Sequence, residues 1–73
     1  MTGADFIAKI EQLGKLRGID VRFDSREGKG SHGRLYYGTA FTTVKDRKKE
    51  TGPGLLISML DDLGLTKADI RGL

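Results

Sequence analysis

Residues 34–44, RLYYGTAFTTV, decide the fold that this sequence predicts. Aromatic and β-branched residues dominate residues 34–37 and 40–44, and the glycine-threonine pair between these runs suits a tight hairpin turn. Upstream, apolar and charged residues alternate over residues 19–24, which is typical of a half-buried strand. The middle of the chain therefore predicts three consecutive antiparallel strands.

Helical patterns flank these strands on both sides. Thr2 and Asp5 are spaced as a capping box, and the apolar residues after them predict a first helix from about residue 3 to 14 or 17. Pro53 at a first helical position and Gly64 at the end bound a leucine-rich second helix. We expect its apolar stripe to comprise Leu55, Leu56, Met59, Leu60 and Leu63.

A second capping box, Thr66 with Asp69, predicts a short terminal helix, and Leu65 and Ile70 are placed to pack together beside it. The resulting α-β-β-β-α order indicates one α+β domain over residues 1–73. In such a domain the helices pack on one face of a three-stranded antiparallel sheet and leave the other face open.

Composition excludes several classes of protein. The chain has no cysteine, so it forms no disulfide framework and has no thiolate nucleophile. A lone histidine offers too few ligands for a conventional zinc site, and we expect no metal and no cofactor. The apolar runs are too short to span a membrane, and the first residues lack the pattern of a signal peptide. We expect a cytoplasmic protein.

The glycine-rich stretch GKGSHG, residues 28–33, matches the G-x-G-x-x-G pattern of dinucleotide sites. That pattern needs a helix immediately after it, whereas a strand is predicted here. A Walker P-loop is excluded for the same reason and because the order is Lys29-Gly30-Ser31. We therefore expect a turn whose glycines are free to direct backbone N–H groups toward an anion, with His32 at the start of the second strand.

Basic residues are concentrated in the middle of the chain. Residues 29–49 contain six lysines and arginines and a single acidic residue, Asp46. Such a segment predicts binding to a phosphate backbone, although a run of solvated lysines without a partner has the same composition. The basic residues are Lys29, Arg34, Lys45, Arg47, Lys48 and Lys49.

GKGSHGRLYY, then FTTVKDRKKE and a leucine helix opened by GPG and ended by DDLGL, resembles the HicA toxins of bacterial toxin-antitoxin pairs. The resemblance covers nearly the whole chain, and its sharpest element is Gly30-Ser31-His32. It implies a double-stranded-RNA-binding-domain-like fold and an endoribonuclease that cleaves mRNA. His32 would be the catalytic residue, with Gly30 shaping the site. Many members have a second histidine or a bulky residue where this chain has Gly33.

The resemblance also implies a partner, a HicB-like antitoxin that blocks His32. We expect the free chain to be a monomer and the neutralised form a hetero-oligomer.

Metal-free RNA cleavage needs a base, an acid and donors for the charge on the phosphate oxygens. Histidine serves as either proton carrier near neutral pH. The second carrier is not identified by the sequence, and its candidates are Tyr36, Tyr37, Lys29 and Ser31. Lys29, Arg34 and Lys45 are candidates for charge stabilisation. The alternative function is an RNA-binding module of the same fold without catalysis.

Overall fold

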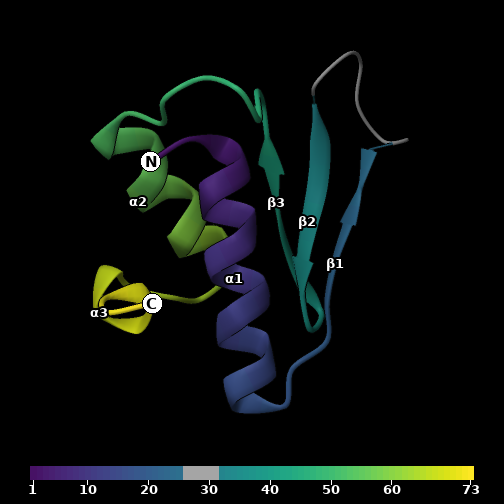
Figure 1. The fold of residues 1–73 in the computed structure, drawn as a ribbon. Helices are drawn as coiled ribbons and strands as arrows, with labels where there is room; N and C mark the ends of the chain where they lie inside the picture. Colours follow the sequence, from purple (N-terminus) through teal and green to yellow (C-terminus); the bar gives the residue numbers. More distant parts are fainter. Residues whose placement is uncertain (26–31) are drawn as a thin grey trace.

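The computed structural model describes residues 1–25 and 32–73 and contains a three-stranded antiparallel sheet with the helices on one face (Figure 1). The strand order is β1-β2-β3, so the predicted fold class and element order are confirmed. No helix in the described ranges is long and apolar enough to cross a membrane. The elements are α1 (Gly3–Arg17), β1 (Val21–Asp24), β2 (Gly33–Tyr37), β3 (Ala40–Val44), α2 (Pro53–Asp62) and α3 (Lys67–Ile70).

The predicted signals at both ends of α1 are present. The hydroxyl of Thr2 accepts a hydrogen bond from the Asp5 backbone at 3.1 Å, and the Thr2 backbone donates to the Asp5 carboxylate at 2.9 Å. The helix ends at Gly18, which has a φ of 68°. Gly14, at the earlier of the two predicted helix ends, lies inside the helix, where a Cβ would come within 2.4 Å of Val21 Cγ2. Glycine at that position allows α1 to approach the sheet.

The strand register assigns each side chain to one face. Val21 pairs with Tyr37, and Tyr36 pairs with Phe41 on the other neighbouring strand. Since successive residues of a strand point to opposite faces, Tyr37 packs against the core and Tyr36 lies on the open face. Ile19, expected to begin the first strand, precedes β1 and is 37% exposed.

The core lies between the sheet and the helices. Leu55 is a correction to the predicted apolar stripe of α2, because it is 40% exposed and lies in the first turn of that helix. Leu56 is partly buried, and the apolar residues closer to the end of the helix, Met59 and Leu60, are buried. The buried core residues are Phe6, Ile7, Ile10, Leu13, Leu35, Val44, Met59, Leu60, Leu63, Leu65 and Ile70.

Two polar contacts join elements that are distant in the sequence. Thr42, which is 2% exposed on β3, donates its hydroxyl to Asp62 Oδ2 at 2.7 Å. Asp62 therefore holds α2 to the sheet. Arg17 at the end of α1 contacts Asp69 of α3 at 2.6 Å, and this carboxylate also accepts from the Thr66 backbone in the second capping box.

Candidate nucleic-acid interface around His32

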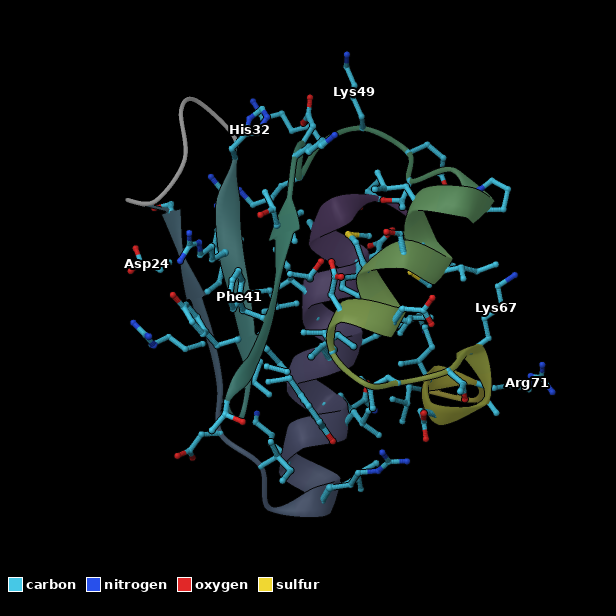
Figure 2. The ribbon with its side chains drawn as sticks, turned by 180° about the vertical axis from the view of Figure 1, so that it is seen from behind. Asp24, His32, Phe41, Lys49, Lys67 and Arg71 are labelled. Carbon is cyan, nitrogen blue, oxygen red and sulfur yellow. The ribbon has the colours of Figure 1, made fainter. Side chains whose placement is uncertain are left out.

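His32 immediately precedes β2 and is exposed at one end of the sheet. Figure 2 shows it at the same end of the molecule as Lys49, whereas Lys67 and Arg71 lie on the side of α3. Of the other residues expected to support the site, Lys29, Gly30 and Ser31 lie outside the described residues.

A pocket of about 360 Å³ brings His32 together with two of the predicted basic residues, Lys45 and Lys49. Its apolar lining comes from the end of β3 and from α2, and Thr51 adds a hydroxyl group. His32, Lys45 and Lys49 all contribute to the lining of this pocket, and their basic character suits a ligand that carries negative charge. The lining residues are His32, Val44, Lys45, Asp46, Lys49, Glu50, Thr51, Leu55 and Met59.

The first turn of α1 fixes the backbone of the basic loop between β3 and α2. The Gly3 N–H donates to the Lys49 carbonyl at 3.3 Å, and the Ala4 N–H donates to the Arg47 carbonyl at 3.0 Å. The first N–H groups of a helix have no partner within the helix, so the loop carbonyls satisfy them. The loop that carries the lysines is thus anchored to the start of the chain.

Gly3 is a residue of the site that the sequence reasoning missed. A Cβ at this position would lie 2.5 Å from the Asp46 carbonyl oxygen and 2.9 Å from the Arg47 Cα. Any side chain at position 3 would therefore push the basic loop away from α1. The available signal was a glycine directly after a threonine N-cap, where glycine has no conformational advantage in a helix.

Both carboxylates that line the pocket have partners. Asp46 Oδ1 accepts a hydrogen bond from the Lys48 backbone at 2.9 Å, which closes a turn inside the basic loop. Glu50 contacts the amino group of Met1, and Thr51 donates its N–H to the Met1 carbonyl. These contacts explain why acidic side chains occur beside two lysines, since the carboxylates organise the loop backbone and the chain terminus.

Among the described residues, the other predicted basic side chains, Arg34, Arg47 and Lys48, do not line this pocket. The Arg47 guanidinium lies over the Phe23 ring, 5.1 Å from its centroid, and Arg34 lies over the Phe41 ring at 4.6 Å. Lys48 is exposed on the basic loop. The structure therefore divides the predicted basic patch into a pocket, a loop and an arginine on the open sheet face.

The strand geometry separates both tyrosine candidates from His32. Tyr36 lies four residues along an extended chain from His32, which corresponds to about 13 Å between Cα atoms. It packs on the open face, where its ring centroid lies 5.8 Å from that of Phe41. Tyr37 is farther along and packs against the core. Lys45 and Lys49 are better placed than either tyrosine to act with His32.

Residues 1–25 and 32–73 contain no group of three or more histidine, cysteine, aspartate or glutamate side chains arranged to hold a metal ion. Comparison of the chain with protein-family models, with curated proteins and with solved structures finds no match.

Proposed function

We propose that this protein is a metal-independent endoribonuclease that cleaves mRNA, with His32 as a general acid or base, as in the HicA-like toxins that its sequence resembles. The observation that carries the proposal is the pocket in which exposed His32 lies with Lys45 and Lys49. An exposed imidazole can carry a proton near neutral pH, and lysines at the same pocket would supply positive charge for the phosphate oxygens.

The proposed reaction uses the ribose of the substrate as the nucleophile. The 2′-oxygen attacks phosphorus as a base removes its proton, and the bond from phosphorus to the 5′-oxygen breaks as an acid protonates that oxygen. Negative charge collects on the non-bridging oxygens during the transfer. Lys45 and Lys49 would stabilise this charge, and His32 would carry one of the two protons.

The test is cleavage of a labelled RNA by the purified protein in the presence of EDTA. We expect the wild type to cut and His32→Ala to bind RNA but to cut roughly 10²- to 10⁴-fold more slowly, the usual loss for one general acid or base. Arg71→Ala is the matched control, because Arg71 is an exposed cation on the side of α3 (Figure 2). It should cut at the wild-type rate.

A wild type that binds RNA without cutting it over hours would refute the nuclease proposal. Cleavage that is undiminished in His32→Ala would refute the assignment of the residue.

A second candidate, an RNA-binding module without catalysis, is favoured by one observation. His32 is the only histidine in the chain, whereas the reaction needs both an acid and a base. The same cleavage assay separates the two functions, since the module would bind RNA and never shorten it.

The HicA-like proposal includes a protein partner, a HicB-like antitoxin that covers His32 and converts a free monomer into an inactive hetero-oligomer. A messenger RNA substrate would place the activity in the cytoplasm. Growth arrest on induction in a bacterium, relieved by co-expression of the neighbouring gene, tests this part of the proposal. The His32→Ala variant should be harmless in the same strain.

A further inference from the structure

The open face of the sheet carries a continuous row of arginine and aromatic side chains. Arg22, Tyr36 and Phe41 are register neighbours on β1, β2 and β3. The Arg22 guanidinium lies 4.5 Å from the Tyr36 ring centroid, and the Tyr36 and Phe41 rings are 5.8 Å apart and tilted by 43°. Arg34 completes the row, 4.6 Å from the Phe41 centroid. Four planar groups thus follow one another across all three strands.

This row faces away from the helices. α1 and α2 pack on the opposite face (Figure 1), and Phe41 remains 45% exposed. Cross-strand contacts between such side chains stabilise a sheet, but packing of the core does not require an aromatic ring at this exposed position. The planar groups therefore form part of the surface of the open face, with an arginine over each ring.

Charge on this face favours an anionic ligand. Among the described residues of the strands, Arg22 and Arg34 stand against one carboxylate, Asp24, whose side chain is 10% exposed and lies 3.8 Å from the Arg22 guanidinium. Arginine guanidinium groups both stack on planar rings and bind phosphate. A ligand with flat rings and phosphates matches the two properties of the surface at once.

One end of the row, at Arg34, lies close to His32 along the chain. Arg34 of β2 follows His32, which immediately precedes that strand, by two residues, so their Cα atoms are about 7 Å apart if the chain is extended there. An RNA strand with one phosphodiester at His32 would therefore bring its neighbouring nucleotides over Arg34 and Phe41.

We propose that the open sheet face binds single-stranded RNA next to the scissile bond, with bases stacked on the row formed by Arg22, Tyr36, Phe41 and Arg34. This inference rests on the proposed function, because it takes RNA as the ligand at His32. Stacking tolerates any base, so the surface adds affinity with little sequence preference. It rejects duplex RNA, whose bases are already stacked on one another.

The test measures binding in the His32→Ala background, so that the probe stays intact. The probe is a fluorescein-labelled single-stranded RNA of about 12 nucleotides, compared with a duplex of the same sequence. Phe41→Leu keeps an apolar side chain but removes the ring, and we expect it to weaken single-strand binding about 5- to 100-fold. Duplex affinity should be unchanged.

Two controls isolate the ring. Phe41→Tyr retains a planar side chain and should bind the single strand as tightly as its parent. Leu16→Ala removes an exposed apolar side chain from α1 and should also have no effect. As a second measurement, an oligonucleotide containing 4-thiouridine should photocrosslink to Tyr36 or Phe41.

Equal single-strand affinity of Phe41→Leu and its parent would overturn the proposal and leave this face to a protein partner. An equal loss of affinity for single-stranded and duplex RNA would also overturn it, because the Phe41 ring would then not act by stacking on unpaired bases. Wild-type cleavage, assayed in parallel, reports on the function of His32 alone. Failure of that assay is therefore distinguishable from failure of the binding surface.

Discussion

The Phe23 ring occupies the space that a side chain at Gly33 would need. A Cβ added to Gly33 would lie 2.4 Å from Phe23 Cζ and 2.9 Å from Cε1, and 3.0 Å from the Asp24 carbonyl oxygen. The Arg47 guanidinium also lies over this ring, so Phe23 links the residue after His32 to the basic loop. The absence of a side chain at position 33 thus makes room for the phenylalanine at position 23.

Gly33→Ala is therefore expected to destabilise the fold by about 1–3 kcal/mol, since the added methyl group overpacks this site. It should also slow any His32-dependent cleavage, because Gly33 must move to relieve the clash. Phe23→Leu removes the ring atoms that would clash and should partly restore the stability of Gly33→Ala. Urea denaturation of the two single variants and the double variant measures this coupling.

The matched control for this cycle combines Phe23→Leu with Gly54→Ala, two positions that share no contact. Their effects should add to within about 0.5 kcal/mol. Equally additive effects for Phe23→Leu and Gly33→Ala would contradict the packing relationship.

The basic loop gives a prediction about the salt dependence of RNA binding. Replacing Lys48 and Lys49 by alanine should weaken binding and reduce the slope of log affinity against log salt by about 0.7 for each lost phosphate contact to a single strand. Lys67→Ala with Arg71→Ala makes the same charge change beside α3 and should leave the slope unchanged (Figure 2). If both double variants keep the wild-type slope, Lys48 and Lys49 do not contact RNA phosphates and serve only to keep the protein soluble.

Two glycines of the α2 region should respond to alanine in opposite directions. Gly54 lies in the first turn of α2, and apart from the adjacent helix backbone no described atom lies within 4 Å of the place that an alanine methyl group would take, so Gly54→Ala should stabilise the protein by roughly 0.5–1 kcal/mol. Gly64 has a φ of 72°, and Gly64→Ala should cost about 1–2 kcal/mol through the left-handed backbone. Thermal denaturation of both variants checks the signs.

Acid should weaken the two capping boxes. Hydrogen bonds from Thr2 lower the pKa of Asp5, and the Arg17 guanidinium with the Thr66 backbone lowers the pKa of Asp69, both from an ordinary value of 3.8. A carboxylate with a lowered folded pKa stabilises the fold fully above its unfolded pKa, and this contribution disappears as the pH falls through the folded pKa. Stability from these groups should therefore decline below pH 3.8.

Urea denaturation of the wild type, Asp5→Asn and Asp69→Asn between neutral and acidic pH tests this dependence. Each variant should be less stable than the wild type at neutral pH and lose less stability in acid. Asp61→Asn, which replaces an exposed carboxylate on α2, is the control. If the stability of the wild type and of both variants falls equally in acid, the capping boxes do not contribute to the pH dependence of stability.

Local sequence patterns predicted the elements of this fold because those patterns act over a few residues. The capping boxes at Thr2 and Thr66 and the left-handed glycines at Gly18, Gly38 and Gly64 all depend on neighbours in the chain. His32 stood out for the same reason, as a single histidine in a short motif. Its placement beside β2 followed from the strand pattern that comes after it.

Only the tertiary structure decided which side chains meet. A shift of one residue in register would exchange Tyr36 with Tyr37 between the faces of the sheet, and residue alternation alone does not choose between them. Likewise, Gly3 approaches the basic loop because the start of α1 lies beside Val44 at the end of β3, and His32 shares a pocket with Lys49 and with residues of α2. Such contacts depend on how distant segments bury a common core, which no local pattern specifies.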